Sequence, residues 1–220
     1  ALPWSADASE FIAKVEEWSP DLVIVDHYSF DARWHDLVQR ALHCKLAVID
    51  DLADRTLQGD ILIDHNYSES HRLKYSGLWP PNLPLLGGPR YALLSTAYQC
   101  TPNHVVHRDV SRIGIFMGGV DAHNYSALAH AACRELARYR GYIEIAATSS
   151  NPHIESLREI CANDPLTSLR LDLPNLAGFF AESDLQIGAG GGATWERCCV
   201  GVPTISVVTA DNQRIVVDSL

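Results

Sequence analysis

The glycine-rich run Leu185-Gln-Ile-Gly-Ala-Gly-Gly-Gly-Ala-Thr-Trp-Glu-Arg197 holds the residues that are best suited to bind an anion. An apolar strand pattern leads directly into consecutive glycines and then into the start of a helix. Glycine permits positive φ and a close approach of the backbone, so we expect both at Gly190, Gly191 and Gly192. Thr194 is expected to cap the helix, whose first N–H groups lack an intrahelical partner. A diphosphate is the expected ligand.

Polar side chains follow this turn at positions that would suit a nucleotide sugar. Glu196 lies in the first turn of the helix, where its carboxylate can accept hydrogen bonds from ribose hydroxyls. After the break at Gly201-Val-Pro203, a strand over Thr204–Val208 leads to Asp211-Asn-Gln213, so Asn212 and Gln213 are placed at the neighbouring strand end. A tightly packed turn, with Glu196 only complementing the helix dipole, is the structural alternative.

Further polar clusters follow other predicted strands. They are Asp26-His27-Tyr28, Asp50-Asp51, Asp64-His65-Asn66, and the Gly118-Gly119 loop with Asp121 and Asn124. Any one of them could be a loop cap, but open α/β sheets collect ligands at strand ends, so their recurrence favours a shared crevice. His27, Tyr28, His65 and His123 are the acid–base candidates. Asp50 and Asp51 point to opposite faces of an extended chain, so no metal site is predicted.

Composition excludes several classes of protein. The chain has 220 residues, 47% hydrophobic content and a net charge of −10, which suits a globular core but neither nucleic acid nor an anionic membrane. The six cysteines include no Cys-x-x-Cys pair, so they are predicted to be reduced thiols. No apolar run reaches membrane-spanning length, and the sequence predicts a cytoplasmic protein.

Alternating strand-like and helix-like segments predict an α/β fold with parallel sheets. The predicted strands are Asp21–Val25, Lys45–Ile49, Ile61–Ile63, Arg112–Met117, Tyr142–Thr148, Ser168–Leu171, Leu185–Ile187 and Thr204–Val208. Periodicity is lost between Tyr98 and Arg112, and a second strand, glycine loop and helix follow, the helix from about Asn124 to Tyr139. We therefore predict two Rossmann-like domains with a cleft between them, over residues 1–104 and 105–220.

Several motifs together resemble a known enzyme family. They are Ile24-Val-Asp-His-Tyr28, Ile49-Asp-Asp-Leu-Ala-Asp-Arg55, Gly88-Pro-Arg-Tyr-Ala-Leu-Leu94, Phe116-Met-Gly-Gly-Val-Asp-Ala-His-Asn124, and Gly188-Ala-Gly-Gly-Gly-Ala-Thr-Trp-Glu-Arg197 with Ala210-Asp-Asn-Gln213. The chain resembles the UDP-sugar hydrolases of pseudaminic acid biosynthesis, which are similar to GT-B glycosyltransferases, especially the peptidoglycan N-acetylglucosaminyltransferase. The resemblance runs through nearly the whole chain.

The resemblance implies hydrolysis of UDP-2,4-diacetamido-2,4,6-trideoxy-β-L-altropyranose to UDP and the free sugar, with no cofactor. Glu196 would hold the ribose, Gly190 to Thr194 the diphosphate, and Asn124 with the Gly118-Gly119 loop would face phosphates and sugar. The backbone around Leu173 would contact uracil. Tyr28, with His27 beside it, would lie next to the sugar and the attacking water.

In the family, the proposed catalytic base is a histidine in a glycine-rich loop after a first strand, and that unit is expected before Ala1. This chain alone is therefore expected to bind UDP weakly and to hydrolyse little. Two other functions stay open, a GT-B glycosyltransferase that uses a UDP-sugar and a non-catalytic UDP-sugar-binding module. A nicotinamide-binding domain is disfavoured because the Gly190–Gly192 run lacks Gly-x-Gly-x-x-Gly spacing.

Overall fold

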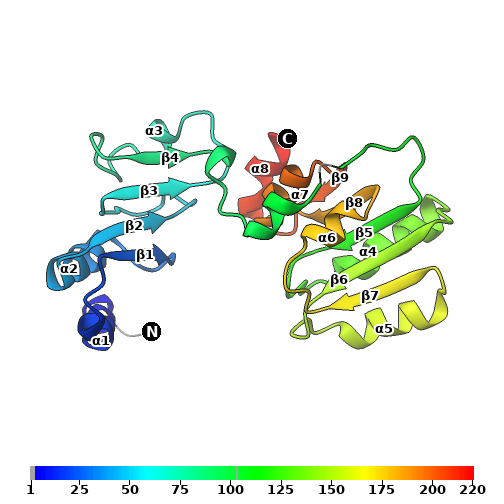
Figure 1. The fold of residues 1–220 in the computed structure, drawn as a ribbon, viewed down its shortest axis with the longest axis horizontal. Helices are drawn as coiled ribbons and strands as arrows, with labels where there is room; N and C mark the ends of the chain where they lie inside the picture. Colours follow the sequence, from blue (N-terminus) through cyan, green and yellow to red (C-terminus); the bar gives the residue numbers. More distant parts are fainter. Residues whose placement is uncertain (1–2, 103) are drawn as a thin grey trace. The chain divides into compact units, whose positions relative to one another are not determined.

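The computed structural model describes residues 3–102 and 104–220, without the side chain of Asn212. The chain divides into two compact units, Ala1–Leu93 and Leu94–Leu220 (Figure 1). Each unit has its own parallel β-sheet, and helices lie in most of the connections between its strands. This arrangement is Rossmann-like and confirms the predicted α/β fold class.

The structural division falls before the boundary that was predicted after residue 104. The segment after Leu93 packs on the second unit, where Leu94, Ala97 and Tyr98 join the apolar cluster that contains Phe179 and Phe180. Tyr98 is only 5% exposed there. The loss of periodicity near Tyr98 therefore marks a helical turn buried in the second unit.

The first unit has one four-stranded sheet in the order β1-β2-β3-β4, with all neighbours parallel. Its elements are α1 (Trp4–Val15), a 3₁₀ turn η1 (Glu16–Trp18), β1 (Leu22–Asp26), α2 (Ala32–Leu42), β2 (Lys45–Ile49), β3 (Ile61–Asp64), α3 (His71–Lys74), β4 (Leu85–Gly87) and η2 (Pro89–Tyr91). Strand β4 was not predicted, because three residues between prolines and glycines carry no readable period.

Alternating burial fixes how the first sheet meets its helices. In β1, Val23 and Val25 are buried while Leu22 and Ile24 are exposed. The buried pair packs with Trp34 and Val38 of α2. The indole Nε1 of Trp34 donates to Asp7 Oδ1 at 2.9 Å, which ties α2 to α1.

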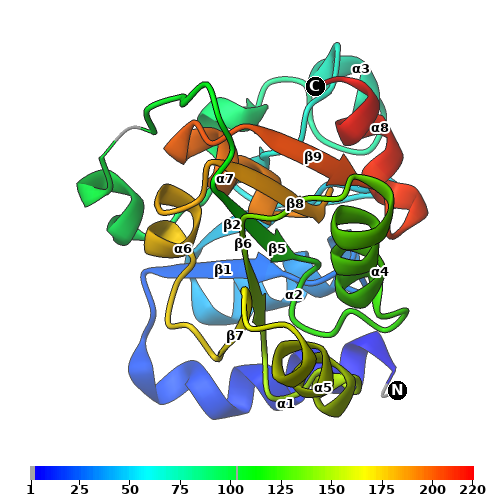
Figure 2. The ribbon, with the colours of Figure 1, turned by 90° about the vertical axis from the view of Figure 1, so that its right-hand side faces the viewer.

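The second unit has a five-stranded parallel sheet in the order β7-β6-β5-β8-β9 (Figure 2). Its elements are η3 (Thr96–Cys100), β5 (Arg112–Phe116), α4 (Tyr125–Ala131), a π-helical turn η4 (Ala132–Leu136), β6 (Tyr142–Ala147), α5 (Ile154–Asn163), β7 (Thr167–Leu171), α6 (Ala177–Ala181), β8 (Leu185–Ala189), α7 (Ala193–Val200), β9 (Thr204–Val207), η5 (Asp211–Gln213) and α8 (Arg214–Asp218).

Helices cover both faces of the second sheet. On one face, α4, η4 and α5 pack on alternate strand residues such as Ile115 and Ile145. On the other face, α6 and α7 pack around Ala146 through Phe179, Phe180 and Val200. The single helix predicted from about Asn124 to Tyr139 is instead an α-helix followed by a π-helical turn.

His35 makes the stability of the first unit depend on pH. The side chain is completely buried on α2, and its Nδ1 accepts a hydrogen bond from the Gln58 backbone at 3.3 Å. Burial, followed by the nearby Arg55 guanidinium, lowers the pKa of His35 to about 4 from an ordinary 6.5. Between these two values the unfolded chain binds a proton that the folded chain does not, so acid favours unfolding.

We therefore expect the unfolding free energy of the first unit to fall by on the order of 2–3 kcal/mol as the pH drops from 6.5 to 4. In His35→Gln, which cannot titrate, this part of the pH dependence should be missing. Urea unfolding followed by circular dichroism at several pH values measures it, with the exposed His123→Gln as control. Parallel pH profiles for wild type and His35→Gln would contradict the assignment.

Candidate functional site

All strands of the second sheet are parallel, so their carboxyl ends share one edge. Strands β6 and β7 extend from β5 in one direction, whereas β8 and β9 extend in the other. The direction in which successive strands are added to the sheet therefore reverses between β5 and β8. Open α/β sheets place ligands at such a switch point. The loop after β5 carries Gly118 and Gly119, and the loop after β8 carries Gly190 to Gly192.

The expectation of positive φ at Gly190, Gly191 and Gly192 is wrong, because none of them adopts it. The requirement for glycine is steric and falls on particular positions. A Cβ on Gly190 would collide with Val217 Cγ2 of α8, whereas a Cβ on Gly192 would meet nothing within 4 Å. Gly190 thus lets the turn pass close to α8, and Gly192 faces open space.

The expectation that Thr194 caps the helix is also wrong. Gly192 is the N-cap of α7, and Thr194 lies within the helix, 2% exposed, where its Oγ1 accepts from Arg197 Nη2 at 3.2 Å. Among the described residues, the backbone N–H groups of Gly191 and Gly192 donate to no protein acceptor. Their dipoles remain available to an anion at this helix start.

Glu196 lies half-buried in the first turn of α7, close to the hydroxyl of Tyr98. Burial raises the pKa of Glu196, while the Tyr98 hydroxyl and Arg197 act against that rise. Burial also raises the pKa of Tyr98, and the Glu196 carboxylate adds to the effect. Tyr98 therefore stays protonated beside an acceptor, and it is a residue that the sequence analysis did not single out.

Gln213 completes the β8–β9 side of the edge. Its Oε1 accepts from the backbone N and the hydroxyl of Thr209, each at 3.0 Å. Its Nε2 would lie 3.6 Å from a Cβ on Gly191, so the amide borders the glycine turn. The structure thus brings Gly190, Gly191 and Gln213 together. The side chain of Asn212 lies outside the described part of the chain.

The residues after β5 that were predicted to contact a ligand have different local roles in the structure. Gly118 has a φ of 91°, which favours glycine, and the Gly119 carbonyl accepts from Thr148 Oγ1 at 2.6 Å. Asp121 is 8% exposed, and its carboxylate accepts from the backbone N of Tyr125 and Ser126, so it caps α4. Asn124 has a φ of 55° and a buried Oδ1 without a partner among the described residues.

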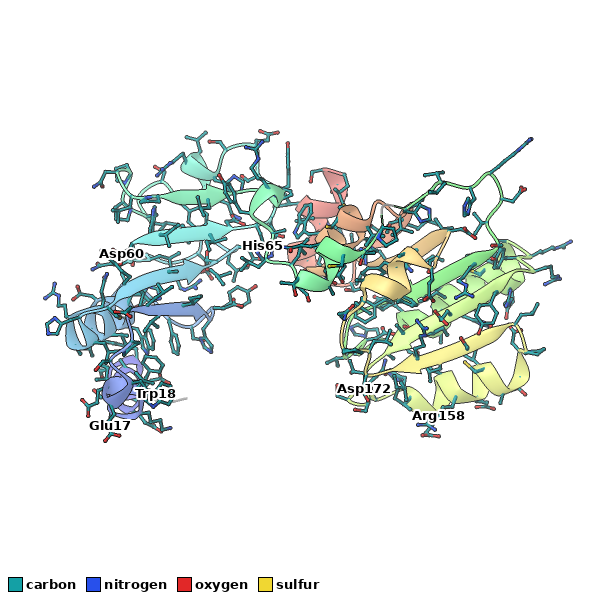
Figure 3. The ribbon with its side chains drawn as sticks, viewed as in Figure 1. Glu17, Trp18, Asp60, His65, Arg158 and Asp172 are labelled. Atoms are coloured by element: carbon teal, nitrogen blue, oxygen red, sulfur yellow. The ribbon has the colours of Figure 1, made fainter. Side chains whose placement is uncertain are left out.

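Leu173 follows β7, which is the outermost strand of the second sheet, and it lies at the same carboxyl ends of the strands. Its side chain is partly buried against the cluster of Phe179 and Phe180. Asp172, which precedes it, has a φ of 52° and accepts from the Ser149 backbone at 2.8 Å; Figure 3 labels Asp172. The hydrogen bond holds the β6 and β7 loops together, and Leu173 stays a predicted uracil contact.

The glycine positions can be tested by a matched pair of substitutions. Gly190→Ala forces α8 or the turn to move, and we expect a loss of about 1–3 kcal/mol in unfolding free energy. Gly192→Ala fits both the open space and the helical φ of −53°, so its effect should stay within about 0.5 kcal/mol. Urea unfolding of both variants gives the comparison, and equal losses would contradict the steric account.

The first unit also gathers polar residues at the carboxyl ends of its strands, but two of its acids are committed internally. Asp50 and Asp64 have completely buried side chains. Arg55 Nη1 lies 2.8 Å from Asp50 Oδ1, and Lys74 Nζ donates to Asp64 Oδ2 at 2.7 Å. The Tyr75 hydroxyl lies 3.0 and 3.3 Å from the two carboxylates. A dedicated cation neutralises each acid, so this cluster holds the loops in place.

Tyr28 and Asp51 lie on the more accessible side of the same edge. Tyr28 is 53% exposed, and its pKa is raised to about 12, first by burial and then by the Asp51 carboxylate. Asp51 Oδ2 in turn accepts from Asn66 Nδ2 at 2.7 Å. Tyr28 is therefore protonated at neutral pH and can donate a hydrogen bond to a water or a sugar, but it cannot serve as a general base.

His27 has its own local partners. Its Nδ1 accepts from the Ser29 backbone at 3.1 Å, and its ring stacks on Phe30 with centroids 4.2 Å apart. In the neutral ring, the proton is therefore on Nε2, which acts as a donor. His65 follows β3, at the opposite end of that strand from Asp60 (Figure 3), and its buried Nδ1 has no partner among the described residues.

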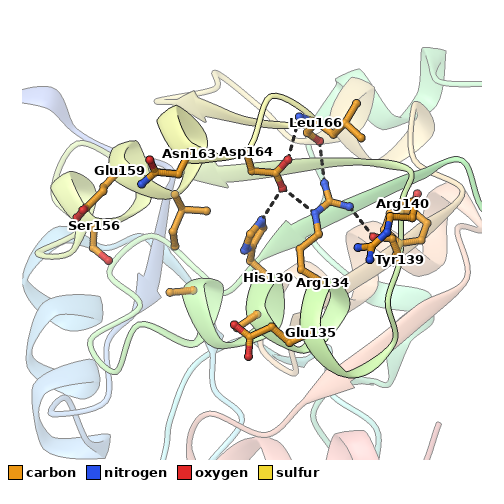
Figure 4. A pocket seen from close by; sticks show the side chains of 13 residues that line it. His130, Arg134, Glu135, Tyr139, Arg140, Ser156, Glu159, Asn163, Asp164 and Leu166 are labelled. Carbon is orange, nitrogen blue, oxygen red and sulfur yellow. Dashed lines mark hydrogen bonds and ion pairs between the residues drawn. The ribbon is translucent and has the colours of Figure 1, made fainter.

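A pocket of about 560 Å³ lies elsewhere on the second unit, between η4, α5 and the start of β7 (Figure 4). Asp164 accepts there from Arg134 Nε at 2.7 Å and from Thr167 Oγ1 at 2.6 Å. Burial opposes ionisation of Asp164, but these donors outweigh it and lower its pKa. Tyr139 and Leu166 precede β6 and β7, so this pocket lies at the amino ends of the strands and contains none of the predicted site residues.

The described part of the chain contains neither a metal-binding cluster nor a membrane-spanning helix. No group of three or more His, Cys, Asp or Glu side chains there converges as a metal-binding set. Within residues 3–102 and 104–220, no helix combines the length and apolar character needed to span a bilayer.

The two parallel sheets, with polar and glycine-rich loops at their carboxyl edges, define an α/β protein of the GT-B type, as predicted. A solved structure of the pneumococcal O-GlcNAc transferase GtfA with UDP and GlcNAc has the same fold over 94% of this chain and 46% of its own, with a TM-score of 0.57 and 15% identity. No protein-family model matches the chain.

Two sequence relatives are distant homologues. The chain is 22% identical over 208 residues to the spore coat polysaccharide biosynthesis protein SpsG of Bacillus subtilis strain 168, covering 93% of this chain and 60% of the relative. It is 28% identical over 181 residues to the UDP-2,4-diacetamido-2,4,6-trideoxy-beta-L-altropyranose hydrolase of Campylobacter jejuni strain NCTC 11168, covering 81% and 62%. The chain thus spans less than two thirds of the relatives that it matches.

Proposed function

We propose that this chain binds a UDP-sugar along the carboxyl edge of its second sheet and belongs to an enzyme that processes it. The observation that carries the proposal is the turn after β8. Gly191 and Gly192 present N–H groups at the start of α7 that have no acceptor in the described part of the chain, and Glu196 and Gln213 lie on neighbouring turns. Backbone dipoles suit a diphosphate, and a half-buried carboxylate suits ribose hydroxyls.

The reaction that fits best is hydrolysis of a UDP-linked diacetamido-trideoxy sugar, the substrate named for the Campylobacter relative. A water oxygen forms a bond to the anomeric carbon, the bond from that carbon to the β-phosphate oxygen breaks, and UDP leaves with the electron pair. N–H groups at Gly191 and Gly192 would stabilise the leaving phosphate. Tyr28, as a protonated donor, would orient the water or a sugar oxygen. The proton that the water loses passes to solvent and not to His27, because Nε2 of His27 already holds a proton.

Nucleotide binding is tested first by calorimetric titration of the chain with UDP. We expect saturable binding that Glu196→Ala weakens by about 1–3 kcal/mol, the scale of a hydrogen bond to a charged group. Glu155→Ala, at an exposed site on α5, is the matched control and should leave binding unchanged. Loss of affinity in both variants, or in neither, would contradict the role of Glu196.

The reaction type is tested by the products formed from the UDP-linked diacetamido-trideoxy sugar. Hydrolysis releases UDP and free sugar in equal amounts, and Tyr28→Phe should lower that rate about tenfold, the value of one positioned hydrogen bond, with UDP affinity unchanged. Sugar that appears only on an acceptor would establish a glycosyltransferase, which the fold shared with GtfA also supports. Binding without UDP release, in a protein that also carries the glycine-rich loop expected before Ala1, would leave a non-catalytic binding module.

A further inference from the structure

Arg197 is a buried cation that forms no ion pair within the described part of the chain, although the neighbouring Glu196 carboxylate acts on it electrostatically. Its side chain is 1% exposed, and among the described residues no carboxylate forms an ion pair with it. Nη2 donates to the Ala189 carbonyl at 2.8 Å and to Thr194 Oγ1 at 3.2 Å. Nε and Nη1 are buried and have no hydrogen-bond partner among the residues that the structure describes. Such a charge is costly to bury unless an opposite charge lies close by.

The guanidinium lies beneath the glycine turn. Its Nη1 would be 2.5 Å from a Cβ placed on Gly188, so only glycine leaves room for it at the end of β8. Its two acceptors, Ala189 and Thr194, bracket Gly190 to Gly192 on either side. The positive charge is thus fixed between the end of β8 and the first turn of α7, where the free N–H groups of Gly191 and Gly192 also lie.

We propose that Arg197 is a positioning residue that makes the turn selective for a diphosphate: its guanidinium holds the Gly190–Gly192 turn, and its uncompensated charge acts on the anion through that turn. The inference rests on the proposed nucleotide site and assigns the source of its phosphate affinity. Ligand phosphate adds negative charge at a cation that no carboxylate of the described residues meets in an ion pair, and the low dielectric around the buried cation strengthens the attraction. A neutral nucleoside gains nothing from this charge.

The test compares UDP with uridine, which shares the base and the ribose but carries no phosphate. In Arg197→Met and Arg197→Gln we expect the dissociation constant for UDP to rise about tenfold or more, while that for uridine changes less than about twofold. Arg197→Lys keeps the charge and should retain most of the selectivity for UDP over uridine. Arg158→Met removes an equal charge from an exposed site on α5 and serves as control (Figure 3).

The wild-type protein provides a second measurement that does not depend on neutral variants folding. In ¹⁵N-labelled protein, the Arg197 Nε–H signal, assigned by its absence in Arg197→Lys, should shift with UDP and stay in place with uridine. Equal losses of affinity for UDP and uridine in the neutral Arg197 variants would overturn the inference and leave Arg197 a packing residue. An Arg197 Nε–H signal that does not shift with UDP would do the same. A folded wild type that binds no UDP would overturn the proposed nucleotide site as well.

Discussion

The parallel direction of every strand is the constraint on which the rest of the structure depends. In both sheets each neighbouring pair is parallel, so each strand delivers the loop after it to the same edge. Loops far apart in the sequence, such as those of Gly118 and Gly190, therefore meet without any contact being specified between them. Polar groups in these loops can therefore be neighbours in the structure although they are far apart in the sequence.

The glycine turn shows how this constraint is met at the level of single atoms. Gly188 gives space to a guanidinium, Gly190 gives space to α8, and Gly192 gives space to solvent or to a ligand. None of these roles needs positive φ. Neighbours on different sides of the backbone can therefore require glycine at different positions of one run. Of Gly188, Gly190 and Gly192, only Gly192 faces open space that a ligand could occupy.

The pattern of apolar residues and the positions of glycines predicted the strands other than β4 and the loops at their carboxyl ends, because both are local properties of the sequence. After a charged first residue, the runs Lys45–Ile49 and Arg112–Phe116 contain no polar side chain, as is typical of buried parallel strands. The sequence could not predict β4, which is three residues long, or the π-helical turn at Ala132–Leu136. The pairings Asp50–Arg55 and Asp64–Lys74, and the burial of Arg197, depend on which loop reaches which strand end. No local sequence pattern encodes which side chains these loops bring together, so the sequence predicted neither the two pairings nor the burial of Arg197.

A net charge of −10 raises the question of how such a chain would attract the diphosphate that we propose as its ligand. In the first unit, Asp50 and Asp64 are compensated in place by Arg55 and Lys74, so these two acids add little repulsion beyond their own cluster. At the site that we propose on the second unit, the positive charge would come from backbone N–H groups and the buried guanidinium of Arg197. Exposed charges are screened by salt within about 8–10 Å, whereas buried ones are screened much less. An attraction built in this way acts at short range, loses little with ionic strength, and selects a ligand by its fit to a fixed turn rather than by charge alone.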